Sequence, residues 1–381
     1  MSGNRRISKL NDTAFDVLKK SQSDYLKKNG FFSNDIFSIS SDAPSSQLRA
    51  AIDIANRVTF AIFLEAVMDD DIETVKKCLD AEPDLISGQP DKNLVIESKL
   101  TWQKFYAENA LTMAVKRKQI KMVELLLPYF DKIEQTEDVI KAKTEALSAF
   151  VFYETKKNAQ NKDEIIIPQE YAAYAQSLIE AFKEESFPHG IPGNAGVPMN
   201  GALSAKTDSA LEALFNILLP KKTVKLDDYI DPELFLLAIY KAYNDNFNAF
   251  QNWEQRDAFS VRMIGLAQNA LSPETAKIFC EGLYYVVEEN RKISGRAESL
   301  KLLDGEAFYH SSRAGRSGLG FDFLCVCDRG WLAWRCRNVD RSLLRFGKSM
   351  SSKSNKFSEI LRSNCCNNQT VTQQMTRGPV A

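Results

Sequence analysis

The sequence contains only two histidines, His189 and His310, in 381 residues. Any imidazole base or imidazole metal ligand would therefore have to come from one of these two positions. Five of the seven cysteines lie near the C-terminus: Cys325, Cys327, Cys336, Cys365 and Cys366. Their spacing lacks the paired C-x₂₋₄-C knuckles of a tetrahedral zinc site, and an odd, unpaired set is typical of a reducing compartment. We predict no metal, no cofactor and no catalytic residue.

Long apolar runs are also missing. The longest candidate, Leu234–Tyr240, is far shorter than the ~18–20 residues that span a membrane. Residues Met1–Leu10 are basic and polar, with no apolar stretch behind them. The sequence therefore predicts neither a transmembrane segment nor a secretory signal peptide, and we expect a cytoplasmic, reducing location.

The composition is that of a folded chain. Apolar residues make up 44% and charged residues 26%, as in an ordinary globular protein. These values exclude a disordered, a collagen-like and a disulfide-rich chain. At roughly 100–200 residues per domain, the length predicts two or three units, or one elongated array.

The formal net charge of −1 conceals two parts of opposite charge. Residues 311–381 contain 12 Lys and Arg against 4 Asp and Glu, whereas residues 1–310 contain 37 against 46. We therefore place a boundary near Ser311. After Met350 the chain becomes rich in Ser, Asn and Gln, which predicts a low-order, flexible basic tail over 311–381.

Two segments of the chain resemble each other without a gap. Ala61–Leu79 reads AIFLEAVMDDDIETVKKCL, and Asn109–Leu127 reads NALTMAVKRKQIKMVELLL. The coinciding residues are Ala66 with Ala114, Val67 with Val115, Ile72 with Ile120, Val75 with Val123, and Leu79 with Leu127. Each segment predicts a short helix, a polar break of three residues and a second helix with apolar residues at i, i+3 and i+7.

Both segments resemble the ankyrin repeat, with its T-P-L-H-x-A-A helix, turn and x-V-V-x-L-L-L helix. The matching positions are Phe63, Ala66–Val67 and Val75–Leu79 in the first segment, and Leu111, Ala114–Val115 and Val123–Leu127 in the second. The Thr-Pro start is missing, and Asp70 and Lys118 replace the glycine of the turn. The segments are 48 residues apart against a family period of ~33, so the extra residues, including Val95–Tyr106, are expected in an enlarged hairpin.

The resemblance implies an all-α repeat stack that other helices extend, because at least ~3 units are needed for stability. Thr144–Phe150 and Gln169–Phe182 are candidates for a degenerate third unit. Asp231-Pro232 and Ser272-Pro273 are start signals for two later helices. The predicted domains are an N-terminal helical cap (1–57), ankyrin-like repeats (58–185), an α-helical domain (186–310) and the basic tail (311–381).

Ankyrin stacks present hairpin tips and first-helix surfaces along one concave face, so the resemblance implies a scaffold that binds a protein partner. The predicted partner-binding residues are Glu65, Asp69, Asp70, Trp102, Tyr106, Lys116, Arg117 and Lys118. We expect the charged members to be exposed. Reversing the charges of Lys116, Arg117 and Lys118 together should then change stability by no more than ~0.5 kcal/mol.

Degenerate ankyrin units within helical, Lys/Asn/Phe-rich sequence also resemble the ankyrin effectors that intracellular bacteria inject through type IV secretion. That resemblance implies a partner in the host cytoplasm. An alternative is an effector enzyme of the hydrolase type, with a site in 186–310 that uses His189 or His310. A third interpretation is contact of the basic tail with acidic surfaces, although no module for specific nucleic-acid binding is recognisable.

Overall fold

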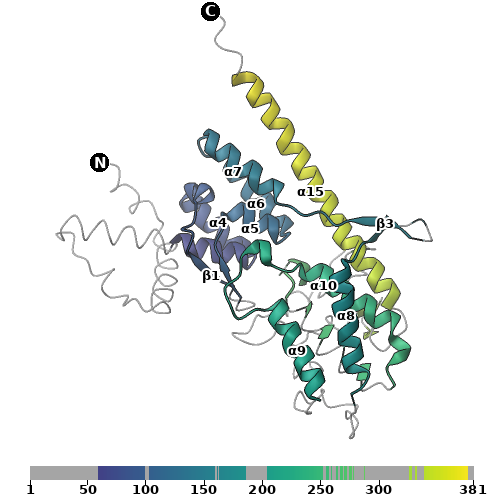
Figure 1. Ribbon diagram of the computed structural model, residues 1–381. Helices are drawn as coiled ribbons and strands as arrows, with labels where there is room; N and C mark the ends of the chain where they lie inside the picture. The colour runs from purple at the N-terminus through teal and green to yellow at the C-terminus, as the bar shows by residue number, and fades with distance from the viewer. Residues whose placement is uncertain are drawn as a thin grey trace, which may run out of the picture. The chain divides into compact units, whose positions relative to one another are not determined.

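A computed structural model of the chain describes residues 59–98, 103–158, 161, 163–185, 204–251, isolated positions between 255 and 287, 326–327, 331–332 and 339–375. Helices dominate this part, beside short two-stranded hairpins (Figure 1), so the predicted predominance of helix is confirmed. Predictions that lie outside the described residues include the N-terminal helices of 1–57, Trp102, His189 and His310. No helix of the described part has the length and apolar character needed to cross a bilayer.

Contacts between residues divide the chain into two compact units. Unit 1 comprises Met1–Lys99, Lys104–Phe150 and Thr223–Asp227, and unit 2 comprises Leu100–Gln103, Val151–Lys222 and Asp228–Ala381. The described elements of unit 1 are helical residues 59–68, α4 (Ile72–Ala81), the 3-10 helix η3 (Pro83–Ser87), β1 (Val95–Glu97), β2 (Lys104–Tyr106), α5 (Ala110–Lys116), α6 (Ile120–Phe130) and α7 (Glu137–Ser148).

The two similar segments fold as helix–turn–helix units with the same turn. Asp70 and Lys118 both have a left-handed backbone, with φ of 56° and 55°, the conformation that favours glycine. The N–H of the next residue donates to the carbonyl five positions earlier, at 2.9 Å for Asp71 and 3.0 Å for Gln119. This is the Schellman pattern that ends a helix and satisfies its last carbonyls.

The burial of the two units agrees in the same register. Val67 and Val115 are buried, as are Val75 and Val123, so matching positions contribute to the core. The matching alanines, Ala66 and Ala114, are buried as well. Hydrogen bonds also join the two helix–turn–helix segments. The Gln119 side chain donates to the carbonyl of Met68 (3.1 Å), and the Tyr129 hydroxyl donates to Asp80 (2.6 Å).

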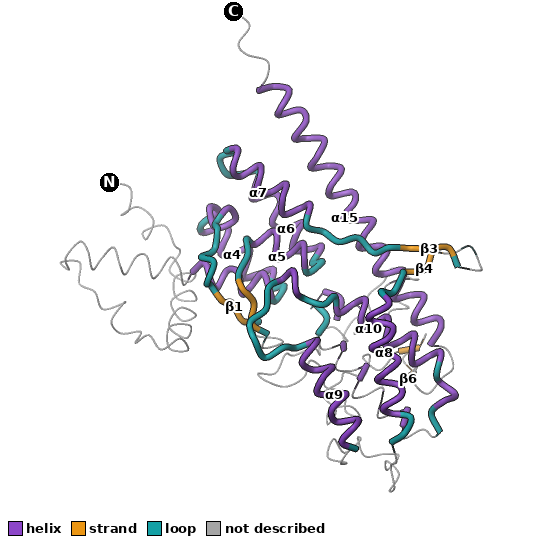
Figure 2. The backbone as a smooth tube through the Cα atoms, viewed as in Figure 1, coloured by secondary structure: helices purple, strands orange, loops and turns teal. Residues whose placement is uncertain are grey.

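As predicted, the chain between the two helix–turn–helix segments forms an enlarged hairpin. β1 and β2 form an antiparallel hairpin at the label β1 in Figure 2. Val95 lies opposite Tyr106, and Glu97 lies opposite Lys104. Ile96 and Phe105, the central pair, are both fully buried. The burial of this pair fixes the register, because a slip by one residue would turn both side chains to the opposite face.

The predicted third ankyrin-like repeat is divided between the two compact units of the chain. α7 belongs to unit 1, whereas α8 (Gln169–Phe182), whose bounds are those expected from the sequence, belongs to unit 2. The division by contacts falls between Phe150 and Val151, whereas the sequence places a domain boundary at residue 185. The physical reason is that α8 packs along α10 (Pro232–Asp245) and buries Leu178 and Phe182 there.

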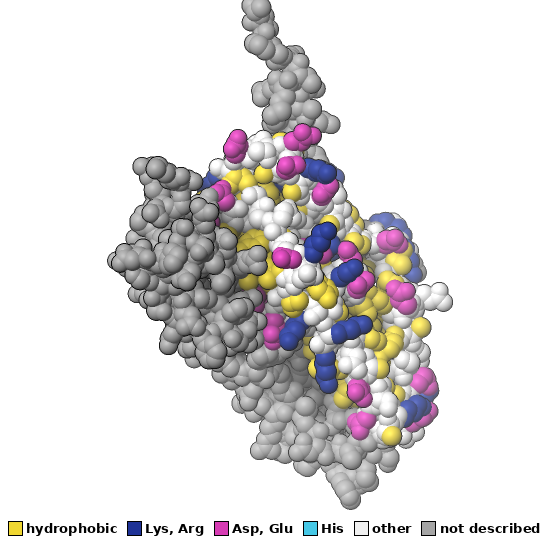
Figure 3. Space-filling view, turned by 60° about the vertical axis from the view of Figure 1, so that its left-hand side comes forward, with side chains coloured by type: hydrophobic (Ala, Val, Ile, Leu, Met, Phe, Trp, Pro, Cys, Tyr) yellow, Lys and Arg dark blue, Asp and Glu magenta, His cyan; other side chains and the backbone are white. Residues whose placement is uncertain are grey.

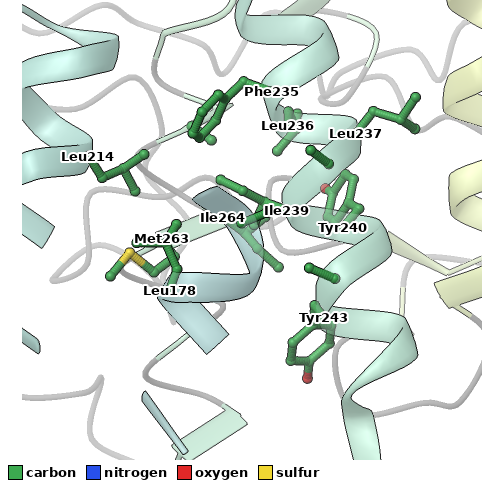
Figure 4. Packing of buried hydrophobic residues seen from close by; sticks show 14 of the residues in the cluster. Leu178, Leu214, Phe235, Leu236, Leu237, Ile239, Tyr240, Tyr243, Met263 and Ile264 are labelled. Atoms are coloured by element: carbon green, nitrogen blue, oxygen red, sulfur yellow. The ribbon is translucent and has the colours of Figure 1, made fainter. Parts of the chain in front are cut away.

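Unit 2 contains α8, α9 (Ala205–Leu218), α10, the hairpin of β3 (Thr155–Lys157) and β4 (Asp163–Ile165), the hairpin of β5 (Val326–Cys327) and β6 (Trp331–Leu332), and α15 (Val339–Met375). The apolar core gathers around α10, and Ile239, Leu178 and Ile264 belong to the same cluster of buried side chains (Figure 4). As the Asp-Pro signal predicts, Asp231 caps α10, and its carboxylate accepts the N–H groups of Glu233 and Leu234.

The tail differs from the sequence prediction, because its residues 339–375 form the long helix α15 (Figure 1). Phe346, Met350 and Phe357 on this helix are buried, and α15 packs against α10 within unit 2. These residues belong to a stripe with alternating spacings of three and four: Leu343, Phe346, Met350, Lys353 and Phe357. A basic composition concealed this apolar helix face, which stabilises the helix by burial.

Candidate functional site

The predicted partner-binding residues of unit 1 lie around two turns and one hairpin. In the first turn, Glu65 is buried, whereas Asp69 and Asp70 are half-buried. Asp69 accepts a hydrogen bond from the Ser98 hydroxyl at 2.6 Å, which connects this turn to the end of β1. The expectation of exposed acidic side chains is therefore wrong for Glu65 and only partly met at the other two positions.

Most of the first helix of each helix–turn–helix segment is buried. Residues 61–68 are all buried, and so are Ala110 to Val115 of α5. In the predicted arrangement, these surfaces would form the concave binding face. No residue of these two stretches is more than 9% exposed, so they offer a partner little contact area.

Lys116 is engaged in two ion pairs within unit 1. Its ammonium group lies 2.8 Å from Glu108 and 2.6 Å from Asp227. Burial disfavours the charge of Lys116, but the hydrogen bonds to Asp227 and Glu108 outweigh burial and raise the pKa above its ordinary value. Lys116 is therefore protonated at neutral pH and presents its charge to two carboxylates of the same chain.

Arg117 and Lys118 are buried, with exposed fractions of 7% and 6%. The Arg117 guanidinium lies 5.6 Å from the ring centre of Phe105, and the Lys118 ammonium lies 5.9 Å from that of Phe150. Both contacts have the geometry of cation–π interactions. The prediction of an exposed basic turn is wrong at these positions, because the long side chains cover aromatic rings of unit 1.

A segment distant in sequence completes the hairpin. Val224 forms a parallel bridge with Phe105, in which the Tyr106 N–H donates to the Val224 carbonyl and the Val224 N–H donates to the Lys104 carbonyl, both at 3.0 Å. β2 therefore pairs with β1 on one edge and with Val224 on the other. Only the apolar Val224 and Leu226, two residues apart, hint at this pairing, and nothing in the sequence identifies its partner.

Tyr106 is the predicted site residue that the structure leaves most clearly exposed, at 39%. It lies at the end of β2. Its N–H donates to the Val224 carbonyl on one edge of the strand, and Tyr106 is paired with Val95 on the other edge. Lys104, two residues earlier on the same face of the strand, is exposed as well. The hairpin therefore presents an ordered aromatic side chain and a cation side by side.

Unit 2 contains a second cluster of polar side chains, and this one is fully enclosed. The Lys353 ammonium lies 2.5 Å from the Glu233 carboxylate, which also accepts hydrogen bonds from the hydroxyls of Tyr153 and Thr275. Lys353 donates to Thr275 as well. All four residues are buried. Because a substrate cannot reach these groups, the cluster fits a role in holding α15 on α10 better than a role in catalysis.

Cys78 is a free, buried cysteine in the described part of the chain. Burial, with the nearby charges of Asp71 and Glu82, raises the pKa of the Cys78 thiol to about 11, so it is protonated at neutral pH. Among the described residues, no group of His, Cys, Asp and Glu side chains is placed to hold a metal ion.

Comparisons with protein-family models, curated proteins and solved structures find no match for this chain.

Proposed function

We propose that the chain is a protein-interaction module built on ankyrin-like repeats, and that its partner contacts the hairpin β1–β2 rather than the first helices. The matching left-handed turns at Asp70 and Lys118 support the repeat assignment. The resemblance to type IV secreted ankyrin effectors extends the proposal to a partner protein of a host cell.

The exposure of Tyr106 on a backbone held from both sides is the observation that carries the proposal. Tyrosine offers a large contact area at a low cost in conformational entropy, and it is enriched among residues that dominate binding energies. A hairpin that is already ordered does not lose this entropy on binding. The first helices have no comparable exposed side chain in 61–68 and 110–115.

The distribution of charged side chains on the face drawn in Figure 3 favours a protein partner over a nucleic acid. Basic and acidic side chains of the described residues are interspersed there, with apolar side chains between them. Nucleic-acid binding relies on clustered Lys and Arg that neutralise several phosphates. The hydrolase alternative has no supporting observation, since His189 and His310 lie outside the described residues.

Quantitative affinity capture with the full chain, followed by titration of the purified partner, tests the proposal. Tyr106→Ala should weaken the partner's affinity by about tenfold or more, because truncating an interface hot spot typically costs ~2 kcal/mol. Phe215→Ala is the matched control, since Phe215 is similarly exposed, at 37%, on α9. An affinity that is unchanged by Tyr106→Ala and by the pair Trp102→Ala, Tyr106→Ala would exclude the hairpin as the binding surface.

A further inference from the structure

The outer edge of β2 is paired with a short segment that comes from a distant part of the chain. Thr223–Asp227 lies between α9 and α10 in sequence, and both helices belong to unit 2. The segment itself belongs to unit 1. It is only five residues long and pairs with β2 through the two backbone hydrogen bonds of Val224.

The side chains of this segment add specific contacts. Val224 is half-buried at the bridge with Phe105, and Leu226 is buried as the first residue of the 3-10 helix η4 (Leu226–Asp228). The Asp227 carboxylate reaches the Lys116 ammonium at 2.6 Å, while 75% of its own side chain stays exposed. Lys225, between the apolar positions, is exposed. Val224 is therefore bound through its backbone by β2, and the helical turn that follows supplies the apolar Leu226 and the Asp227 carboxylate that pairs with Lys116.

We propose that the outer edge of β2 is a strand-accepting site for a partner segment that is extended at one β-branched residue and then turns to present a carboxylate, and that Thr223–Asp227 occupies this site as an internal competitor. The inference rests on the proposed function and names the chemistry of its partner. Sheet edges bind extended peptides through main-chain hydrogen bonds, and contacts of individual side chains add specificity. The preferred segment carries a β-branched residue, an apolar residue two positions later and a carboxylate next to it.

The internal segment has the properties of a replaceable ligand. Two backbone hydrogen bonds, the buried Leu226 side chain and one ion pair hold a segment of only five residues, and the ion pair contributes little because 75% of the Asp227 side chain is exposed. Its advantage is the linkage to the same chain, which gives an effective concentration in the millimolar range for short linkers. A partner segment with the same side chains and additional contacts, for example at Tyr106, would displace it.

The probe is a fluorescein-labelled peptide with the sequence of residues 221–228, KKTVKLDD, titrated into the full chain and followed by anisotropy. Val224→Pro in the chain removes the N–H that donates to Lys104 and should open the edge of β2. We expect the peptide to bind this variant about tenfold or more tightly than wild type, because the competing segment no longer occupies the site. Val224→Thr retains the backbone N–H and is the matched control, with wild-type affinity.

The peptide with Asn in place of the residue corresponding to Asp227 should bind the Val224→Pro chain about two- to fivefold more weakly, as expected for loss of an exposed ion pair. If Val224→Pro does not fold by circular dichroism, Asp227→Asn in the chain provides the second test. This change weakens the internal ligand alone and should tighten binding of the unmodified peptide by a similar factor.

Equal peptide affinity for wild type and the folded variants would overturn the strand-accepting site. Equal affinity of the Asp and Asn peptides would overturn the role of Lys116. Failure of this inference is distinguishable from failure of the proposed function. If binding of the partner is lost with Tyr106→Ala but is not strengthened by Val224→Pro, the hairpin remains the binding surface and strand addition is excluded.

Discussion

Asp70 and Lys118 adopt the same left-handed backbone conformation, with φ of 56° and 55°, in turns that lie 48 residues apart in the sequence. The ankyrin pattern has glycine at both positions. For a residue with a Cβ atom, this conformation costs roughly 1–2 kcal/mol. Both turns therefore store strain that the packing of the flanking helices must offset.

Asp70→Gly should be neutral or stabilise the chain by up to ~1 kcal/mol, because relief of the Cβ strain offsets the greater entropy of glycine in the unfolded chain. Asp70→Val should destabilise it by about 1–2 kcal/mol, since β-branched residues are disfavoured there. Urea unfolding followed by circular dichroism measures both. Lys77→Gly, at an exposed interior position of α4, is the control and should cost ~1 kcal/mol. Equal losses for both glycine variants would contradict the strained turn.

Ala114→Leu should destabilise unit 1 by about 1–3 kcal/mol. Ala114 is fully buried, and added methyl groups would overpack the contact. Ala81→Leu, at the exposed end of α4, should stay within ~0.5 kcal/mol. Thermal unfolding of both variants compares them directly, and an unchanged melting temperature for Ala114→Leu would show that the position tolerates a larger side chain.

Periodicity along the chain predicted much of the fold. The bounds of α8 and the cap of α10 follow from local signals, namely apolar spacing and the Asp-Pro pair. The placement of Val224 beside Phe105 could not be predicted in this way, because the two residues are 119 positions apart and only tertiary structure joins them. Local patterns describe what a segment can form, but not which distant edge it pairs with.

The candidate site shows the same limit at the level of side chains. A run of three cations in a turn is normally exposed, and the ankyrin resemblance implies that Lys116, Arg117 and Lys118 belong to a binding face. Tertiary contacts with Asp227, Phe105 and Phe150 give these side chains internal partners instead. The exposure of Tyr106, by contrast, agrees with expectation, because alternation along a short strand leaves one face to solvent.

Changing Lys116, Arg117 and Lys118 together to Glu should now destabilise unit 1 by several kcal/mol rather than by ~0.5. The substitutions replace two cations that cover aromatic rings and put like charges next to Glu108 and Asp227. The control is Lys76→Glu, Lys77→Glu on the exposed face of α4, which should cost no more than ~0.5 kcal/mol. Circular dichroism melts distinguish the two sets, and similar melts would restore the interpretation of a solvated turn.

Phe346→Ala should cost about 3–5 kcal/mol in the unfolding of unit 2. Phe346 is 1% exposed, and its ring meets that of Tyr240 edge to face at 6.3 Å between centroids. Leu344→Ala, two residues earlier on α15, removes a side chain that is 43% exposed and should cost far less. Equal effects of the two variants would show that α15 is not packed through the face that contains Phe346.

Lys353 and Glu233 form the buried ion pair between α15 and α10. Removing one charge leaves the other buried without its counterion, so Glu233→Gln and Lys353→Met should each cost about 3–5 kcal/mol. The double variant should recover much of the loss, because an apolar side chain in place of the cation needs no partner. A double-mutant cycle by urea unfolding measures the coupling, and strictly additive losses would argue against a direct interaction.

The same pair predicts the pH dependence of unit 2. Burial alone would raise the pKa of Glu233, but the charge and hydrogen bond of Lys353 outweigh burial and lower it. Its contribution is therefore fully present above the unfolded value of ~4.3 and is lost as the pH falls through the lower folded value. Burial alone would lower the pKa of Lys353, but Glu233 raises it, so this contribution is present below ~10.4 and is lost as the pH rises through the higher folded value. The urea midpoint of wild type should thus exceed that of Glu233→Gln, Lys353→Met by a constant amount between about pH 5 and 10, and the difference should shrink outside this window. A difference that is independent of pH from 3 to 11 would show that neither group changes its pKa on folding.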